Sequence, residues 1–255
     1  MNNLFGNMEQ IAIERLKEFE KIALSKHPDG YYLAYSGGKD SDVILDLAKR
    51  SGVKFTAHHH LTTCDPPELV YHVRTHPEVE IHKPKETIWH MIRRKKMLPE
   101  RFRRYCCELL KERGGNEVMV ITGVRWAESS KRSKRKMTET CMRNKRKQYM
   151  NPIIEWSDKD VWDYLNSNNI PYCKLYDEGW KRLGCVLCPM VNAQQATKEA
   201  KRWPKIYQAW KNAHHSYFEP DKSQWDSADD AFNAWMNRDK NNGNPDDNQM
   251  MFFED

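Results

Sequence analysis

The sequence predicts an α/β fold with a mainly parallel twisted sheet, helices on both of its faces and a small helical C-terminal part. Two observations predict it. Short apolar segments typical of buried strands alternate with segments whose apolar residues recur at helical spacing. The segment NEVMVITGVR (116–125) is rich in Val and Ile, with a glycine near its end, as expected of a buried strand. Because crossovers between parallel strands are right-handed, the loops after the strands should meet at one site.

The expected elements follow one another regularly up to residue 125. Helical periodicity over residues 8–25 predicts a first helix. The next elements, in chain order, are a strand at 30–36, a helix at 40–52, a strand at 53–61, a helix at 66–76 opened by prolines, a strand at 79–84, a helix at 86–98 and the strand at 116–125.

The pattern changes after Pro152. Ser157 is placed to cap a helix, and a loop with glycine and cysteine continues to Pro189. Two helices are expected at 192–217 and 224–238, where four tryptophans should pack rather than bind a ligand. These changes divide the chain into an N-terminal helix (1–27), a core domain (28–190) and a helical extension with a loose tail (191–255).

Composition favours a ligand that carries phosphates. The 255 residues have a net charge of +6 and a pI near 8.8, which also permits nucleic acid. The positive charge is uneven, since residues 131–147 hold nine Lys or Arg against one Glu. The apolar runs are too short to span a membrane, and the first residues do not resemble a signal peptide. We therefore expect a cytoplasmic protein that has no membrane partner.

The loop SGGKDS (36–41) has the chemistry of a phosphate site. It lacks the spacing of a Walker loop or of GxGxxG. Gly37 and Gly38 nevertheless permit a tight turn after a strand, and the helix that follows places its positive end at the same point. Lys39 adds a mobile charge and Ser41 a hydroxyl donor, which an ordinary strand–helix turn does not need.

Charged residues also follow the other predicted strands. Asp65 and Glu68 come after the second strand, and Arg125 and Glu128 come after the fourth. Carboxylates beside a triphosphate usually hold Mg²⁺, and Asp40 could do so if the ligand is ATP. By contrast, the run 58–60 of three histidines is a poor metal site, because alternate residues of a strand face opposite sides.

Four cysteines occur as two close pairs. Cys106 and Cys107 are adjacent, and Cys185 and Cys188 form a CxxC. In a chain without export signals, such grouping indicates metal or redox chemistry rather than disulfides. Four thiolates suit either tetrahedral zinc or a four-iron cluster. Adjacent cysteines bind a single zinc ion awkwardly but can each bind a different iron, so we favour the cluster over zinc.

These motifs together resemble a known family. SGGKDS is similar to the PP-loop of the adenine nucleotide α-hydrolase superfamily. Several stretches then follow in the order of the phosphoadenosine phosphosulfate (PAPS) reductase family, roughly over residues 28–190. These stretches are TTCDPPELVYHV, LPERFRRYCCELLK, ITGVRWAESSKR, NPIIEWSDKDVWDYL and LYDEGWKRLGCVLCP.

The resemblance implies an adenine nucleotide ligand, either ATP or an adenylylated sulfate. GxRxxESxxR, from Gly123 to Arg132, is similar to the family's segment that grips phosphate or sulfate. The residues expected to contact the nucleotide are Ser36, Gly37, Gly38, Lys39, Asp40, Ser41, Asp65, Gly123, Arg125, Glu128, Ser129 and Arg132. Lys39 and Asp40 are also expected to act in catalysis. The spacing of the cysteine pairs is similar to the [4Fe-4S] set of assimilatory adenylyl-sulfate reductases.

One departure from the family concerns the catalytic thiol. Reductases of this group carry a cysteine near the C-terminus in a Glu-Cys-Gly-like motif, whereas no cysteine follows Cys188 here. Cys141 lies in the basic segment 131–147, and basic neighbours favour the thiolate, so we expect Cys141 to act as the catalytic thiol beside the nucleotide. Cys64 is expected to be buried and inert, and Cys173 to lie away from the strand ends.

Three hypotheses of function follow. The first is ATP-dependent sulfur transfer, in which an acceptor is adenylylated, pyrophosphate is released and sulfur displaces AMP. It resembles tRNA thiolation and DNA phosphorothioation, and segment 131–147 could guide a nucleic acid acceptor. The second is a PAPS or adenylyl-sulfate reductase that uses a non-standard thiol. The third is a non-catalytic nucleotide-binding regulator. In either reaction a partner protein could supply the sulfur or the electrons.

Overall fold

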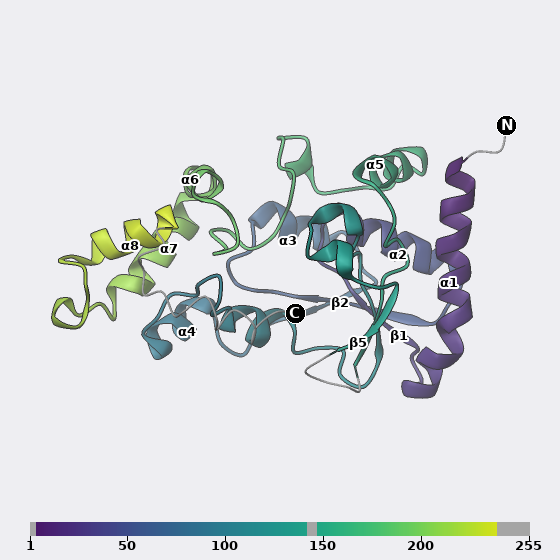
Figure 1. Cartoon of the computed structure of the whole chain (residues 1–255), viewed down its shortest axis with the longest axis horizontal. Coiled ribbons are helices and arrows are strands. Elements are labelled where there is room, and N and C mark those ends of the chain that lie inside the picture. Colours follow the sequence, from purple (N-terminus) through teal and green to yellow (C-terminus); the bar gives the residue numbers. More distant parts are fainter. Residues whose placement is uncertain (1–3, 142–146, 239–255) are drawn as a thin grey trace. The chain divides into compact units, whose positions relative to one another are not determined.

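The computed structural model describes residues 4–141 and 147–238 (Figure 1). It divides into two compact units that each combine distant parts of the chain. Unit 1 comprises Met1–His60, Pro67–His82 and Arg113–Leu183, and unit 2 comprises Leu61–Pro66, Lys83–Glu112 and Gly184–Asp255. The units do not follow the expected boundaries at residues 27 and 190. The first helix belongs with the sheet, and both cysteine pairs belong to unit 2.

Unit 1 contains a six-stranded sheet in the order β3-β2-β1-β4-β6-β5. The strands are β1 (Tyr31–Ala34), β2 (Phe55–His60), β3 (Val79–His82), β4 (Met119–Ile121), β5 (Thr138–Thr140) and β6 (Gln148–Met150). All neighbouring pairs are parallel except β5 and β6. The predicted α/β class with a mainly parallel sheet is therefore confirmed. Chain order reverses between β1 and β4, which is where ligands bind in open α/β sheets.

Four helices accompany this sheet: α1 (Leu4–Lys26), α2 (Lys39–Ser51), α3 (Pro67–Arg74) and α5 (Asp158–Ser167). The α2 helix packs against both α1 and α5, beside the sheet (Figure 1). The core lies between them, where Leu16, Leu33 and Val161 are fully buried. Ser157 caps α5 as predicted, because its hydroxyl accepts from Asp160 N while the Asp160 carboxylate accepts from Ser157 N.

The β5–β6 hairpin was not expected, since no strand was predicted between residue 125 and Pro152. Short 3₁₀ turns at Trp126–Glu128 and Arg132–Lys134 precede it. Its strands have three residues each, too few for an alternating pattern to be recognised. The β4 strand is also shorter than predicted, because pairing with β1 and β6 covers only three residues.

Unit 2 is helical. It contains α4 (Ile88–Lys95), a π-helical turn at Cys107–Lys111, α6 (Ala193–Arg202), α7 (Pro204–His215) and α8 (Ala228–Asn237). The helix expected over 192–217 is two helices, because Pro204 begins a new one at its first position. Trp203, Trp210 and Trp235 are buried, and Trp210 packs against Trp89 and Trp235, so three of the four tryptophans form a core as predicted. Trp225 is only partly buried. None of the described helices combines the length and hydropathy needed to cross a membrane.

Candidate functional site

The SGGKDS loop joins β1 to α2 at the carboxyl edge of the sheet. Gly37 has φ +77°, and a Cβ there would lie 2.7 Å from Val73 and 2.8 Å from Leu69 of α3. Glycine is therefore required by both backbone and packing. The Ser41 hydroxyl donates to Gly38 O at 2.7 Å, and Gly38 N donates to the Ser36 hydroxyl at 3.3 Å. These bonds fix a compact turn at the positive end of α2.

A network of charged groups surrounds this turn. Lys39 Nζ lies 3.2 Å from a carboxylate oxygen of Asp40 and 3.2 Å from Asp158 Oδ1. Arg125 Nε donates to Asp40 Oδ1 at 2.6 Å, and its Nη2 donates to Asp158 Oδ1 at 2.7 Å. Residues from the ends of β1 and β4 and from the start of α5 therefore converge at this edge, as the topology predicts.

Burial and charge distinguish the members of the network. Lys39 and Arg125 are buried, whereas the Asp158 side chain is largely exposed. Burial by itself would raise the pKa of Asp158, but hydrogen bonds from Arg125 and Lys39 outweigh it and lower the pKa below the ordinary aspartate value. Asp158 is thus held ionised beside the loop.

The Arg125 side chain is buried and contacts other protein groups. Its side chain is 1% exposed, and the third donor, Nη1, bonds to Trp156 O at 3.0 Å. The nitrogens expected to grip phosphate or sulfate therefore bond to protein acceptors. In this structure Arg125 positions the carboxylates of Asp40 and Asp158.

The rest of the GxRxxESxxR segment folds back on itself. A Cβ on Gly123 would lie 2.9 Å from Asp40 O, so β4 approaches the start of α2 closely. Glu128 accepts from Arg125 N at 3.0 Å and pairs with Arg132. The Ser129 hydroxyl accepts from Arg132 N at 3.2 Å. The structure therefore places these predicted residues around Arg125, with Glu128 and Ser129 bonded within their own segment.

Sequence reasoning missed two residues of this site. Asp158 follows the capping Ser157, where an aspartate is an ordinary first-turn residue and gives no functional signal. Tyr176 lies in a 3₁₀ turn, and its hydroxyl accepts from Lys39 N at 3.0 Å. It also lies 3.2 Å from where a Cβ on Gly38 would be. Both residues lie in stretches that resemble the family, NPIIEWSDKDVWDYL and LYDEGWKRLGCVLCP, but nothing in those stretches indicates that they reach the loop, because they do so through tertiary packing.

Cys141 is not where it was predicted to be. It follows Thr140 at the end of β5, which runs antiparallel to β6, and its backbone N bonds to Lys147 O. Thr140 pairs with Gln148, the first residue of β6. Because β6 is parallel to β4 and β1, this end of β5 lies at the amino edge of the sheet. The SGGKDS loop lies at the carboxyl edge, so the expectation that Cys141 lies beside the nucleotide is wrong.

Cys173 also differs from expectation. It is buried at 1% exposure and precedes the turn that carries Tyr176. Burial raises the pKa of its thiol, and the carboxylates of Asp42 and Glu68 raise it further. Cys173 is therefore close to the start of α2, although it is a poor thiolate.

The four paired cysteines converge within unit 2. Each is half-buried, and the thiols of Cys106, Cys107, Cys185 and Cys188 perturb one another's ionisation. The neighbouring Cys106 thiol, helped by Lys111, lowers the pKa of Cys107 to about 7. The charge of Cys185 in turn raises the pKa of Lys111. Lys111 is therefore a cation beside Cys107 and Cys185, the two cysteines whose pKa values are lowered.

Cys64 and Asp65 lie with this set in unit 2. Cys64 is 3% exposed, which confirms the expected burial, and its pKa is raised by the Cys185 thiol and by burial. The Thr62 hydroxyl lies 3.4 Å from Cys185 Sγ. Asp65 was expected at the nucleotide, but its carboxylate accepts from Thr62 N at 2.7 Å and acts on the charges of Lys111 and Cys185.

Two charged side chains from the C-terminal helices hold the CxxC loop. Glu199 of α6 accepts from Leu187 N at 2.6 Å, and Leu187 has a positive φ of 60°. The Arg238 guanidinium, just after α8, donates to Cys188 O at 3.2 Å and Val191 O at 3.2 Å. The helices after residue 191 therefore shape the backbone of one cysteine pair.

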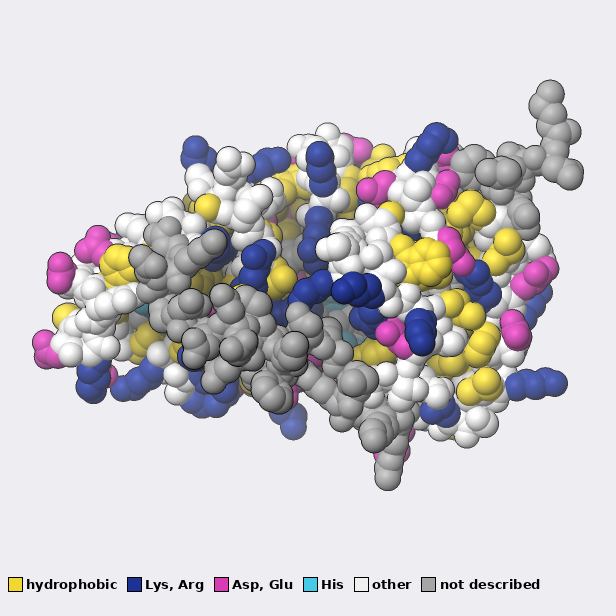
Figure 2. Space-filling view, in the orientation of Figure 1, with side chains coloured by type: hydrophobic (Ala, Val, Ile, Leu, Met, Phe, Trp, Pro, Cys, Tyr) yellow, Lys and Arg dark blue, Asp and Glu magenta, His cyan; other side chains and the backbone are white. Residues whose placement is uncertain are grey.

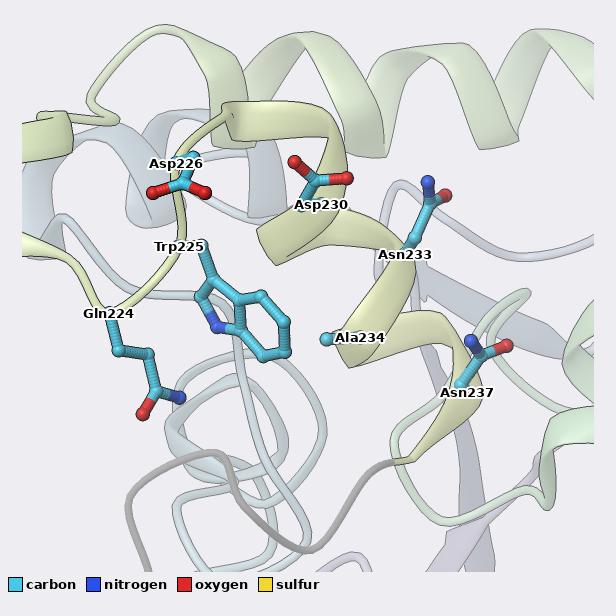
Figure 3. A pocket seen from close by; sticks show the side chains of 7 residues that line it. All are labelled: Gln224, Trp225, Asp226, Asp230, Asn233, Ala234 and Asn237. Atoms are coloured by element: carbon cyan, nitrogen blue, oxygen red, sulfur yellow. The ribbon is translucent and has the colours of Figure 1, made fainter.

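Two other features are a pocket at α8 and the basic segment 131–147. Unit 2 has a pocket formed by α8 and the loop before it, lined by Gln224, Trp225, Asp226, Asp230, Asn233, Ala234 and Asn237 (Figure 3). It contains no residue predicted to be functional. In the basic segment, Arg132 and Arg135 pair with glutamates and Lys134 is exposed, while 142–146 fall outside the described residues. Lys and Arg side chains are spread over the face shown in Figure 2.

Residues 30–191 match the phosphoadenosine phosphosulfate reductase domain family over more than half of the chain. The chain belongs to this family. Among curated proteins, this family member is 31% identical over 239 residues to the uncharacterized protein MJ0066 of Methanocaldococcus jannaschii, covering 85% of the chain and 47% of that protein. It is 34% identical over 87 residues to the adenosine 5'-phosphosulfate reductase of Oceanobacillus iheyensis, covering 32% of the chain and 34% of that protein. The chain thus spans less than half of these relatives.

Solved structures show the same fold. The PAPS reductase of Candida auris, in a phosphate complex, has a TM-score of 0.53 at 22% identity, covering 72% of the chain and 95% of that structure. The FMN adenylyltransferase of Candida glabrata, in complex with ATP, has a TM-score of 0.50 at 16% identity, covering 71% of the chain and 61% of that structure. At these identities the similarity concerns the fold of the PAPS reductase family domain.

Proposed function

We propose that this protein binds MgATP at the SGGKDS loop and adenylylates an acceptor as the first step of sulfur transfer. The observation that carries the proposal is the charged network at the ends of β1 and β4. It combines a lysine, the positive end of a helix and two carboxylates around one phosphate-sized turn. Membership of an adenine nucleotide family and the ATP complex of the Candida glabrata protein of similar fold support the same ligand.

The carboxylates favour ATP over an adenylylated sulfate. Asp158 is exposed and held ionised, and Asp40 is its neighbour through Lys39 and Arg125. Carboxylates beside a triphosphate commonly hold Mg²⁺, whereas the phosphosulfate group of a sulfonucleotide carries less charge than a triphosphate and needs no such ion. Lys39 would exchange its carboxylate partners for phosphate oxygens, while Arg125 would keep the carboxylates in place.

The proposed chemistry is a substitution at phosphorus. An acceptor oxygen attacks the α-phosphorus of ATP, the bond to the β-phosphate oxygen breaks, and pyrophosphate leaves. A sulfide then attacks the activated carbon of the acceptor and displaces AMP. This sequence has no net oxidation or reduction when the donor is sulfide. The exposed lysines of the basic segment make a nucleic acid acceptor part of the proposal.

We further propose that Cys106, Cys107, Cys185 and Cys188 hold a [4Fe-4S] cluster. Among the described residues, which include all seven cysteines, no three sulfurs lie within 4.8 Å of one another. Tetrahedral zinc with bonds of about 2.3 Å would need sulfurs about 3.8 Å apart, whereas a cubane separates its ligands more widely. Lys111 supplies a cation to the anionic thiolates. When bound, such a cluster would supply electron transfer or electrostatic stabilisation.

A second candidate function is the reduction of adenosine 5'-phosphosulfate. The observation that favours it is the similarity to reductases such as that of Oceanobacillus iheyensis. It would place a sulfonucleotide at the same loop and would release no pyrophosphate.

The deciding experiment compares nucleotides on anaerobically purified protein. We expect tight binding of MgATP and weaker binding of adenylyl sulfate and PAPS, and pyrophosphate release once a sulfur acceptor is added. Lys39→Ala should weaken ATP binding by about 10²-fold or more, because charge at the phosphates is lost. Lys49→Ala is the matched control, since Lys49 lies on the same helix but pairs with Glu78. Preferential binding of a sulfonucleotide, without pyrophosphate release, would replace the first candidate by the second.

A further inference from the structure

Unit 1 holds a group of side chains that the proposed function does not use. Asp42, His72 and His76 each offer a ligand atom, and these atoms all lie within 4.8 Å of one another. Asp42 lies on α2 and His72 on α3. The chain continues to turn after α3, since His76 N donates to Val73 O at 3.2 Å. The two histidines are four residues apart, the spacing that places two imidazoles on one face of a helix as in metal-binding motifs.

The distances suit a small metal ion. His72 Nε2 lies 3.0 Å from Asp42 Oδ1, and His76 Nε2 lies 4.0 Å from the same oxygen. In a tetrahedral site with bonds of about 2.0–2.1 Å, ligand atoms are about 3.3 Å apart. Both distances from Asp42 differ from this value by less than an ångström, and the ligand atoms of the two histidines lie within 4.8 Å of each other.

Two polar atoms of this group have no hydrogen-bond partner among the described residues, whereas Asp42 Oδ1 and His72 Nε2 are bonded to each other. Asp42 Oδ2 and His76 Nε2 are buried and form no hydrogen bond among the residues that the structure describes. The Asp42 side chain is 0% exposed. Buried polar atoms are nearly always paired, so two such atoms in one group indicate a ligand that takes the lone pairs of both. A cation does so, whereas a simple ion pair between Asp42 and His72 leaves both atoms unexplained.

Two neighbouring side chains act on this group. The Tyr35 hydroxyl donates to Asp42 Oδ1 at 2.5 Å, so Oδ2 is the carboxylate oxygen left without a donor. Glu78 Oε1 lies 3.8 Å from His76 Nδ1, too far for a hydrogen bond but close enough for an ion pair. After a small shift the Glu78 carboxylate would orient the imidazole of His76, as carboxylates do at metal-bound histidines.

We propose that Asp42, His72 and His76 bind a divalent transition-metal ion of the zinc class. Two imidazoles and one carboxylate form a donor set that such ions prefer. The ion would tie α3 to α2 directly behind the SGGKDS loop, whose Gly37 packs against Leu69 and Val73 of α3. Its role would be to stabilise unit 1, and it is independent of the reaction at the loop.

A second histidine group in unit 1 provides the control. His58, Glu80 and His82 also come within 4.8 Å of one another. However, His58 Nδ1 is already hydrogen-bonded to His82 Nε2 at 2.8 Å, and His58 Nε2 to Thr56 at 2.8 Å. His72 Nε2 of the first group is also bonded, to Asp42 Oδ1, so the two groups differ in their buried unpaired atoms: among the described residues the first group has two and the second has none. We therefore expect no metal at the second group.

The experiment measures zinc bound per chain after loading with Zn²⁺ and removal of the excess. His76→Gln should bind about one zinc ion less than the wild type, and His82→Gln should bind as much as the wild type. Any zinc that the cysteines take up in place of iron is the same in all three proteins. The difference in zinc content therefore reports only on Asp42, His72 and His76. With Co²⁺, the wild-type protein should show additional ligand-field absorption, without thiolate charge transfer, that His76→Gln lacks.

Thermal unfolding provides a test that does not depend on a variant folding normally. Zn²⁺ should raise the unfolding temperature of the wild type and of His82→Gln, and a chelator should reverse the effect. Equal zinc content in the wild type and His76→Gln would overturn the proposal. An unfolding temperature of the wild type that does not respond to Zn²⁺ or to the chelator would also overturn it.

Discussion

Replacing Arg125 by methionine tests the charged network directly. The change keeps a long apolar side chain but removes the donors to Trp156 O, Asp40 and Asp158. The buried carbonyl of Trp156 loses the bond from Nη1, a loss that costs about 1–3 kcal/mol. The Asp40 and Asp158 side chains are 22% and 72% exposed and keep Lys39, so each contributes only about 0–1 kcal/mol. We expect the free energy of unfolding of unit 1 to fall by about 1–5 kcal/mol, the sum of these three contributions.

The assay is hydrogen–deuterium exchange of peptides from β1 and β4, combined with urea unfolding. Peptide resolution is needed because a chain of two units need not unfold in two states. Arg15→Met is the matched control, since Arg15 also donates to a carbonyl, that of Pro152, and pairs with Glu155 at a more exposed position. We expect it to cost at most about 1 kcal/mol. Equal destabilisation by the two substitutions would refute the argument from burial.

The stability difference between the wild type and Arg125→Met should also depend on pH. The folded-state pKa of Asp158 is lower than its unfolded value, so its contribution to stability is present above the unfolded pKa and is lost as the pH falls through the folded pKa. Because Arg125 causes much of this shift, the stability difference between the wild type and Arg125→Met should shrink as the solution is acidified below about pH 4. Asp158 is largely exposed, so the change should stay within about 1 kcal/mol. A difference that grows in acid would contradict this assignment.

Three further predictions concern the backbone at Gly37, the support of the CxxC loop by Arg238, and the position of Cys141. Gly37→Ala should destabilise unit 1 and weaken nucleotide binding more than Gly52→Ala does; both have positive φ, a penalty of about 1–2 kcal/mol, but only Gly37 has neighbours within 3 Å of the added Cβ. Similar unfolding midpoints for the two variants would mean that the close contacts of an added Cβ at Gly37 cost no stability. Arg238→Met should lower iron per chain, measured by elemental analysis, because carbonyls of the CxxC loop lose their donor. Cys141→Ser should leave iron content and nucleotide turnover unchanged; lost turnover would contradict its place at the amino edge.

Local features of the fold were predictable from the sequence, because they depend on neighbouring residues. The alternation of strands and helices, the glycine turn at residue 37 and the Ser157 cap depend on periodicity, φ and short-range hydrogen bonds. The break at Pro204 could also have been found, because proline begins helices more readily than it continues them. The β5–β6 hairpin could not, since its short polar strands are stabilised by pairing at the sheet edge.

The candidate site was predictable only in part, for a related reason. Lys39, Asp40 and Arg125 belong to motifs and lie together, but Asp158 and Tyr176 join them from segments more than 110 residues after Lys39. Asp65 was assigned to the nucleotide because it follows β2. The chain after β2 instead enters unit 2, where the carboxylate closes a turn beside the cysteines. Position after a strand indicates an edge of the sheet but does not fix where the next residues go.

The direction of β5 decides whether Cys141 can be the reacting thiol. Cys141 was predicted to lie beside the nucleotide. Its segment leaves the sheet at the same strand end as Arg125, so that prediction holds only if the chain stays at that edge. The antiparallel β5 carries it across the sheet instead. Cys173 interacts with Asp42, but burial and that carboxylate disfavour its thiolate. Neither thiol of unit 1 therefore combines position with reactivity. Under the proposed function, this favours sulfide or a sulfur-donor protein over a cysteine of unit 1 as the group that displaces AMP.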